Sequence, residues 1–123
     1  MNNNYIAEYD AIVSVVNNYI EGGRAGSGAI TKRAFHDQAN LFGYFGNNLL
    51  GPEMQKLYDL RDKIGPAKDV IAARFTHVDI TGTTANVRLD TERAGKPLYT
   101  DYLNMVKLDG AWIIVSKVFH THA

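Results

Sequence analysis

The spacing of apolar side chains changes once along this chain, and that change constrains the fold more than any other feature. Up to Gly65, apolar residues recur mainly at steps of three and four, as on one face of an amphipathic helix. From Val70 onwards the step is two, which is typical of strands whose alternate side chains face opposite sides of a sheet. Helices that come first and long strands that come last favour an α+β fold over alternating βαβ units. We predict one domain over residues 1–123.

Three helices and a short strand are predicted before this change. The first helix covers residues 5–21 and is expected to end at Gly22-Gly23. Its apolar stripe consists of Tyr5, Tyr9, Ile12, Val16 and Tyr19. A shorter helix is capped by Ser27 and passes through Phe35, and residues 39–45 are predicted to form a short strand. A third helix opens at Gly51-Pro52-Glu53 and stops at Gly65-Pro66.

Two β-hairpins are predicted in the second half of the chain. Their strands and turns are residues 71–81 and 84–91 around Gly82-Thr83, and residues 97–108 and 111–121 around Asp109-Gly110. Asp-Gly is a favoured dipeptide for a two-residue hairpin turn. Closing each hairpin on its two turn residues sets the cross-strand pairs, and alternation then divides the side chains between two faces.

The second hairpin has two largely apolar faces in this register. The face expected under the helices consists of Tyr99, Asp101, Leu103, Met105, Trp112, Ile114, Ser116, Val118 and His120. The opposite face bears Asn104, Val106, Val115 and Phe119, and it is too apolar to remain in water without a partner. We therefore predict a homodimer through this outer face, since twofold dimers are the commonest oligomers. In the first hairpin, Arg74 is predicted on the inner face.

Asp101 is an acidic residue on the predicted inner face. A buried carboxylate must be ion-paired, hydrogen-bonded or protonated, because an isolated buried charge is too costly. Arg74 and His120 fall toward the same end of that face and are its natural partners. Two interpretations stand with equal weight: a structural ion pair that closes one end of the fold, and a functional carboxylate with a perturbed pKa.

Charge and cysteine content exclude several classes of function. Lys plus Arg and Asp plus Glu both total 13, so the formal net charge is zero, whereas bulk binding to phosphates needs an excess of basic residues. There is no cysteine to form a disulfide or bind a metal as thiolate. No basic and apolar leader is visible at the start, and the apolar runs are too short to span a bilayer. We expect a soluble, cytoplasmic protein with no nucleic-acid or membrane partner.

Several short segments, in their order and spacing, resemble the nuclear transport factor 2-like superfamily over nearly the whole chain. They are VNNYIEG at 16–22, FHDQA at 35–39, FGY at 42–44, TDY at 100–102, KLDGAWII at 107–114 and KVFHTH at 117–122. More narrowly, the chain is similar to the putative lumazine-binding branch, close to the SnoaL-like polyketide-cyclase-like proteins. The resemblance implies a cystatin-like cone in which three N-terminal helices pack on a strongly curved antiparallel sheet. The superfamily includes isomerases, dehydratases, cyclases and non-catalytic modules, so the fold does not set the function.

The ketosteroid isomerases of this superfamily provide a test at the level of single residues. There, a tyrosine late in the first helix and an acid on a late strand form the oxyanion hole, and a separate carboxylate is the general base. The resemblance matches Tyr19 to the tyrosine and Asp101 to the strand acid. The base position aligns with Gly43, beside Tyr44, and neither residue supplies a carboxylate. We therefore do not expect steroid-isomerase chemistry.

Histidines are the other candidates for chemistry. His36 and Asp37 adjoin at the predicted end of the second helix, either as a base with its orienting carboxylate or, more simply, as a histidine that complements the helix dipole. His120 and His122 share one face of the last strand. Two ligands without a clear third are too few for a structural metal site, and we predict neither a metal nor another cofactor.

We predict that the cone binds a small apolar or aromatic molecule in a mainly apolar pocket with a few polar groups. The candidate ligand-binding residues are Tyr19, Tyr44, Arg74, Asp101, Trp112 and His120. One alternative is an enzyme of the polyketide cyclase, dehydratase or isomerase type, with Asp101 or His36 as the acid–base residue. A second alternative is a non-catalytic interaction module in which the polar groups only seal the core.

Overall fold

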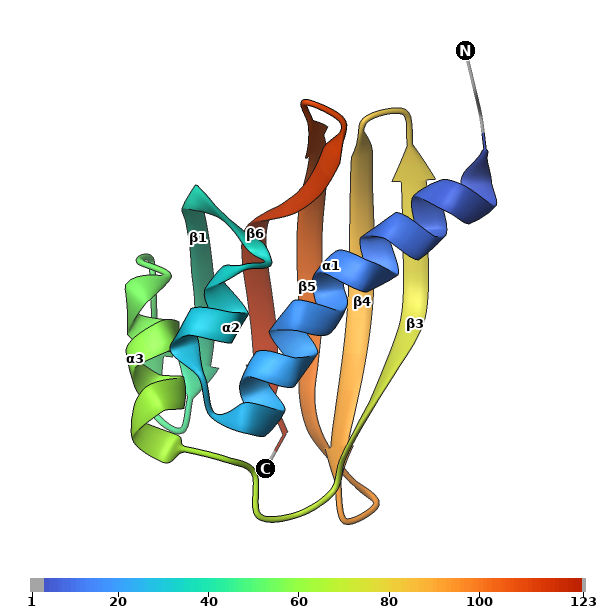
Figure 1. Ribbon diagram of the computed structural model, residues 1–123. Coiled ribbons are helices and arrows are strands. Elements are labelled where there is room, and N and C mark those ends of the chain that lie inside the picture. The colour runs from blue at the N-terminus through green and yellow to red at the C-terminus, as the bar shows by residue number, and fades with distance from the viewer. Residues whose placement is uncertain (1–3, 123) are drawn as a thin grey trace.

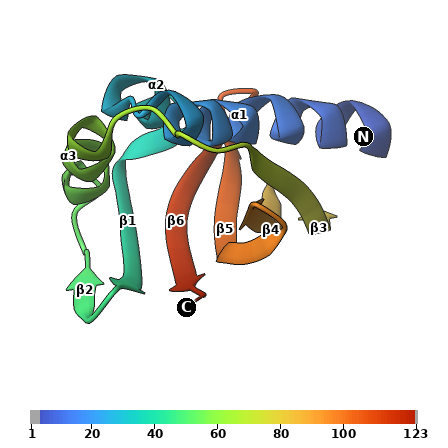
Figure 2. The same ribbon diagram turned by 90° about the horizontal axis from the view of Figure 1, so that it is seen from below.

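The computed structural model describes residues 4–122, in which three helices lie over one face of a six-stranded sheet (Figure 1). The elements are α1 Tyr5–Ala25, α2 Gly28–Lys32, β1 Phe35–Phe45, β2 Asn48–Leu50, α3 Gln55–Ile64, β3 Ile71–Thr81, β4 Thr84–Arg93, β5 Lys96–Leu108 and β6 Ala111–Thr121. The strand order across the sheet is β2-β1-β6-β5-β4-β3. Viewed from below, the helices form one layer and the strands curve away beneath it (Figure 2).

The predicted α+β class is confirmed, and the sheet differs from the expectation in two respects. It is mixed rather than purely antiparallel, because β1 pairs with β6 in parallel while the other strand pairs are antiparallel. The three helices also do not form the continuous N-terminal block that the resemblance implies, because β1 and β2 precede α3, in agreement with the strand predicted at residues 39–45. The chain passes from β2 through α3 to β3, so α3 closes the edge of the layer beside β1 (Figure 1).

The first helix is one turn longer than predicted. Its N-terminus is capped by Asn4, whose side chain accepts a hydrogen bond from the backbone N–H of Ala7. It continues through the glycine pair and ends at Gly26, which adopts the left-handed conformation with φ 62°. Gly22 is buried against Thr31 of α2, so this glycine serves a close helix approach rather than a helix end.

The second helix is shorter than predicted. Ser27 caps it as expected, since its hydroxyl accepts from the N–H of Ile30, but the helix ends at Lys32. Phe35 already belongs to β1 and pairs with Ile114. The segment joins the sheet instead of extending the helix, because the carbonyl oxygen of Ala34 accepts a hydrogen bond from the backbone N–H of Ile114 at 3.0 Å. His36 therefore lies in a strand and not at a helix end.

The two hairpins and their turns are confirmed, but each contains an irregularity that strict alternation does not predict. In β6 the register shifts at Val115, because Met105 pairs with Ile114 whereas Asn104 pairs with Ser116. This β-bulge moves every later side chain of β6 to the other face of the sheet. Phe119 is consequently 8% exposed on the inner face, while Val118 is 52% exposed on the outer one.

A second bulge changes the face of residues in β3. Thr76 is the extra residue, since Phe75 pairs with Leu89 and His77 with Arg88. Phe75 packs against the core, and Arg74 is exposed with its guanidinium donating to the carbonyl of Ala73. The expectation that Arg74 lies on the inner face is wrong for this reason.

The core lies between the helical layer and the concave face of the sheet. It is built from α1, α3 and the inner side chains of β1, β4, β5 and β6, among them Ile12, Val16, Leu41, Leu89, Leu103 and Ile114. The outer face carries a row of neighbours across three strands, in which Val118 pairs with both Phe42 and Tyr102. All three side chains are exposed.

Candidate functional site

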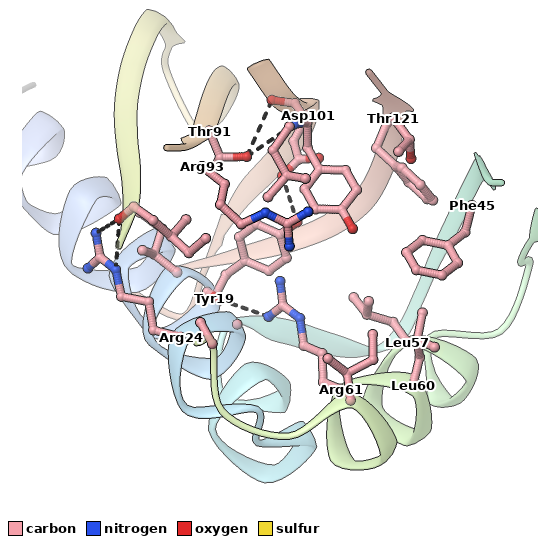
Figure 3. Close-up of a pocket in the computed structure, with 18 of the residues that line it drawn as sticks. Tyr19, Arg24, Phe45, Leu57, Leu60, Arg61, Thr91, Arg93, Asp101 and Thr121 are labelled. Atoms are coloured by element: carbon pink, nitrogen blue, oxygen red, sulfur yellow. Dashed lines mark hydrogen bonds between the residues drawn. The ribbon is translucent and has the colours of Figure 1, made fainter. Parts of the chain in front are cut away.

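A cavity of about 540 Å³ lies between the C-terminal part of α1, α3 and the inner face of β4, β5 and β6 (Figure 3). One wall is apolar and includes Leu57 and Leu60 of α3 with Phe45 at the end of β1. The polar lining groups come from α1, α3 and the sheet, and include Tyr19, Arg61 and Asp101. This combination of apolar lining and a few polar side chains is typical of sites for small molecules.

Tyr19 and Asp101 form a buried pair at the base of the cavity. The tyrosine hydroxyl donates a hydrogen bond of 2.6 Å to Oδ2 of Asp101, which is 1% exposed. The second oxygen, Oδ1, is buried without a hydrogen-bond partner among the described residues. Burial, and then the neighbouring Asp101 carboxylate, raise the pKa of Tyr19 well above its ordinary value, so this hydroxyl keeps its proton. The pair is a buried carboxylate with one oxygen held by Tyr19 and the other without a donor among the described residues.

Lys117 brings a buried amine to the same cavity. Its side chain is 4% exposed, and its Nζ lies 4.6 Å from the centre of the Tyr19 ring and 4.7 Å from that of Phe119. Among residues 4–122 it forms no ion pair with a carboxylate. Burial lowers the pKa of Lys117 to about 8, although Asp101 acts in the opposite direction. A lysine in this state exchanges its proton near neutral pH.

Arg61 of α3 covers Tyr19 from the other side. Its Cζ lies 4.4 Å from the ring centre, and its Nη1 donates at 2.7 Å both to the backbone carbonyl of Tyr19 and to the hydroxyl of Thr31. The guanidinium thereby ties α3 to both other helices and fixes the tyrosine ring between two cations.

Positive charge outweighs negative charge around the cavity. Arg24, Arg61, Arg93 and Lys117 line it, whereas Asp101 is the one carboxylate among the described lining residues. Arg24 is engaged with the carbonyl of Ile71 and with Glu21. Arg61 and Arg93 point toward one another across the cavity (Figure 3). An anionic or strongly polarised oxygen on a ligand is favoured in such a field.

The structure brings together two of the predicted ligand-binding residues, Tyr19 and Asp101. Tyr44 is 60% exposed on the outer face of β1, and Trp112 is buried in the core and does not line the cavity. Arg74 and His120 are exposed on the outer side of the sheet. Their predicted contact with Asp101 does not form, because the bulges in β3 and β6 turn both side chains away from it.

Other tyrosines expected in the interior also lie elsewhere. Tyr5 and Tyr9 are 61% and 41% exposed, because α1 extends beyond the sheet at its N-terminal end (Figure 1). The Tyr5 hydroxyl nevertheless donates to the carbonyl of Ile80 at 2.7 Å. Tyr5 thereby ties the start of α1 to β3, and neither tyrosine lines the cavity.

The second catalytic candidate, His36, lies at a different hollow. It lines a depression with Asp37, Glu53 and Tyr58 on the far side of β1. Its Nδ1 accepts a hydrogen bond from the backbone N–H of Gln38, so the ring is oriented by its own strand. His36 and Asp101 therefore belong to two separate places.

Sequence reasoning missed Lys117 and Arg61 as site residues. Strict alternation assigned Lys117 to the outer face, and only the bulge reverses this. The sequence did contain a signal for this position. Lys117 lies two residues before Phe119, so the two side chains share one face of the strand, and a bulky apolar residue such as Phe119 favours the buried face. For Arg61 the signal was its position on the apolar stripe of the third helix, between Leu57 and Ile64.

No metal centre or membrane helix is found in residues 4–122. No group of three or more His, Asp or Glu side chains is arranged to hold an ion there, and His120 and His122 contact each other edge to face at 4.8 Å between ring centres. No helix in this part of the chain has the length and hydrophobicity needed to cross a bilayer.

Comparison with known proteins now decides the family. The model of the family described as putative lumazine-binding matches residues 7–120. The chain belongs to this family. It is 36% identical over 117 residues to the aldolase FrzH of Cladobotryum sp, and the match covers 94% of this chain and 93% of that protein.

Solved structures agree with this assignment. A nuclear transport factor 2-like protein of unknown function from Shewanella baltica OS155 is 38% identical, with a TM-score of 0.89 and 99% of each chain covered. A domain with a cystatin-like fold from Nostoc punctiforme PCC 73102 is 15% identical, has a TM-score of 0.71, and covers 95% of this chain and 78% of its own. The latter supports the fold alone, and both confirm the predicted nuclear transport factor 2-like, cystatin-like architecture.

Proposed function

We propose that this protein binds a small, largely apolar carbonyl compound in the cavity and catalyses acid–base chemistry at the carbon next to the carbonyl. The observation that carries this proposal is the Tyr19–Asp101 pair in the cavity lining, in which one carboxylate oxygen is held at 2.6 Å and the other is buried without a partner among the described residues. A buried lone pair without a donor is costly, and such groups gather where a protein keeps a reactive site.

Each polar group has a role in this reaction. Oδ1 of Asp101 accepts the proton from the carbon next to the carbonyl, and the Tyr19 hydroxyl holds the carboxylate in place. The negative charge that develops on the carbonyl oxygen is stabilised by the ammonium of Lys117 and the guanidinium of Arg61. The apolar wall of α3 binds the rest of the ligand and excludes water.

The aldolase relative supports carbonyl chemistry rather than simple binding. An aldol reaction begins with the removal of a proton beside a carbonyl, and the relative so named is 36% identical over nearly the full length of both chains. Steroid-isomerase chemistry is not part of the proposal. Gly43, at the position expected for that base, is closed off by Phe119, whose ring occupies the space that a Cβ would need.

Deuterium exchange into a ketone tests the proposal directly. The probe is 4-phenylbutan-2-one in D₂O, with loss of the proton signals beside the carbonyl followed by NMR. We expect exchange catalysed by the wild-type protein and a loss of at least about 100-fold in Asp101→Asn, the usual scale for removing a general base. Asp79→Asn is the matched control, because Asp79 is an exposed carboxylate on the outer side of β3.

The two alternatives give different results in the same samples. A binding protein without catalysis shows a raised melting temperature with the ketone but no exchange above the buffer rate. An interaction module shows neither effect. Equal exchange rates in the wild type and in Asp101→Asn would overturn the role of Asp101.

A further inference from the structure

Lys117 has surroundings that a purely structural lysine lacks. Its amine is enclosed by the rings of Tyr19 and Phe119, and no carboxylate pairs with it in the described part of the chain. Lysine is almost never buried without a partner, because its charged form loses hydration. The side chain nevertheless lines a cavity large enough for a small organic molecule. The amine is thus directed at a place where a ligand would lie.

The position of Lys117 relative to Asp101 is set by the sheet. Asp101 pairs with Phe119 and Leu103 pairs with Lys117, so Asp101 and Lys117 are diagonal neighbours on the inner face of β5 and β6. Diagonal neighbours lie roughly 7–8 Å apart at their Cα atoms, within reach of a long side chain. Both residues line the cavity, so a ligand carbon bound beside them would lie near an amine and a carboxylate whose Oδ1 has no donor among the described residues.

We propose that the Nζ of Lys117 is a nucleophile that forms a covalent imine with an aldehyde or ketone bound in this cavity. This inference rests on the proposed function and gives it a covalent step. It also changes the role of Lys117, because the protonated imine replaces the free ammonium as the group that accepts electrons.

The step balances with water as the one by-product. The neutral amine forms a C–N bond to the carbonyl carbon, and the carbonyl oxygen takes up a proton to give a carbinolamine. The hydroxyl takes up one more proton from solvent and leaves as water, which leaves a protonated C=N bond. Oδ1 of Asp101 then removes the neighbouring proton, and the C–H electron pair forms the C=C bond of an enamine while the C=N pair moves to nitrogen. The enamine then adds through carbon to a second carbonyl, which forms the C–C bond and restores the protonated C=N bond, while the proton held by Asp101 passes to the new alkoxide. Addition of water to the C=N bond then releases the product carbonyl and the amine of Lys117.

The charge state of Lys117 suits this step. With its pKa lowered to about 8, roughly a tenth of the amine is neutral at pH 7, compared with roughly one in three thousand for an ordinary lysine. Besides Lys117, the titratable and charged residues that line the cavity are Tyr19 and Arg24 from α1, Arg61 from α3, Arg93 from β4, Tyr99 and Asp101 from β5, and His122 after β6. Asp101 is the only acid in this group, so it alone opposes the loss of the lysine proton.

Reductive trapping tests the imine. The wild-type protein is incubated at pH 7 with 4-methoxybenzaldehyde and sodium cyanoborohydride, and peptide mapping by mass spectrometry follows the labelling of every lysine with time. We expect Lys117 to be labelled at least tenfold faster than the exposed Lys63, Lys68 and Lys96, with a rate that levels off above about pH 8. The labelling rate of the exposed lysines, in contrast, is expected to keep rising with pH beyond this point. Because all lysines are compared in one protein, this measurement does not depend on the folding of a variant.

Lys117→Arg is the matched variant, because it keeps a cation and cannot form an imine. We expect this variant to lose the fast labelling, and we expect its rate of deuterium exchange into 4-phenylbutan-2-one to fall at least tenfold. Labelling spread evenly over all lysines in the wild type would overturn the imine. Two results would overturn the imine and leave the proposed acid–base function standing. One is deuterium exchange in the wild type without trapping of Lys117, and the other is an unchanged exchange rate in Lys117→Arg. Absence of exchange in the wild type, with trapping at Lys117, would instead overturn the proposed function and retain the nucleophile.

Discussion

The hydroxyl of Tyr19 on α1 donates a 2.6 Å hydrogen bond to Oδ2 of Asp101 on β5, across 82 positions of sequence. The bond fixes the helical layer to the sheet at the base of the cavity. It also leaves Oδ1 as the unsatisfied oxygen of a buried carboxylate. One contact therefore contributes to the fold and orients the proposed base.

Removal of this hydroxyl is expected to destabilise the protein. In Tyr19→Phe the Oδ2 atom of Asp101 loses its donor while staying buried, and we expect the free energy of unfolding to fall by about 1–3 kcal/mol. Asp101→Asn keeps an oxygen that accepts from Tyr19 and is expected to fold. The coupling energy of the contact is measured with a third variant, Asp101→Ala, which removes the accepting oxygen: urea unfolding is compared for Tyr19→Phe, Asp101→Ala and the double variant. A coupling near zero would contradict the contact.

Lys117→Met is expected to stabilise the protein while it disables the site. Replacing an unpaired buried charge with an apolar side chain of similar length raises the free energy of unfolding at pH 7 by about 1–3 kcal/mol. Lys63→Met, at an exposed position of α3, is the control and is expected to be near neutral. A lower free energy of unfolding in Lys117→Met would show that the cation–π contacts outweigh the cost of burial.

The gain from Lys117→Met is expected to depend on pH with a definite sign. The folded protein holds the pKa of Lys117 at about 8, below its ordinary value of 10.5, so between these values the folded state binds fewer protons than the unfolded state. The free energy of unfolding of the wild type therefore rises through this group as pH rises from 8 to 10.5. The stability advantage of Lys117→Met over the wild type shrinks over the same range. Unfolding of both proteins at pH 7, 9 and 10 measures the difference, and a constant difference would contradict the lowered pKa.

A methyl group at Gly22 is expected to force α1 and α2 apart. A Cβ there would lie 2.6 Å from the backbone nitrogen of Thr31 and closer still to the hydroxyl oxygen of the same residue. We expect Gly22→Ala to lower the free energy of unfolding by about 1–3 kcal/mol, although alanine favours a helix. Gly23→Ala is the control, because its Cβ would meet no backbone atom and only the guanidinium of Arg61, at 3.2 Å from Nη2. Equal stability of the two variants would show that the helices move without cost.

The predicted homodimer through the outer face remains a proposal, with a corrected set of residues. Phe119 leaves that face, and the exposed row of Phe42, Val118 and Tyr102 takes its place. We expect the wild type to sediment as a dimer at micromolar concentration and Val118→Glu as a folded monomer. Val70→Glu, at an apolar residue exposed outside the sheet, is expected to remain a dimer. A monomeric wild type would end the proposal.

Much of the architecture was predictable because it is encoded locally. The Asp109-Gly110 turn, with φ values of 50° and 81°, closes the second hairpin where the sequence indicates. The third helix and its end at Gly65 are confirmed as well, but the helix begins at Gln55 and not at Gly51-Pro52-Glu53, since Glu53 bridges to Asn40. The inward position of Asp101 was also predictable, since no irregularity lies between it and the rest of its strand's inner face.

The remaining errors arise from single residues whose conformation depends on distant neighbours. Val115 and Thr76 become extra residues in their strands, and each bulge reverses the face of the neighbouring part of its strand. In β6 this buries Phe119 and leaves Val118 in solvent, which removes the larger side chain from water. The same shift carries Lys117 into the cavity and His120 out of it.

By itself the sequence determined the order of helices and strands, the two hairpin turns and the burial of Asp101, because periodicity and turn chemistry act over a few neighbouring residues. Only the tertiary structure decided which partner Asp101 has and which amine it shares the cavity with. The physical reason is that a one-residue bulge is chosen by packing across the whole sheet, and that choice exchanges every later side chain on the strand between core and solvent.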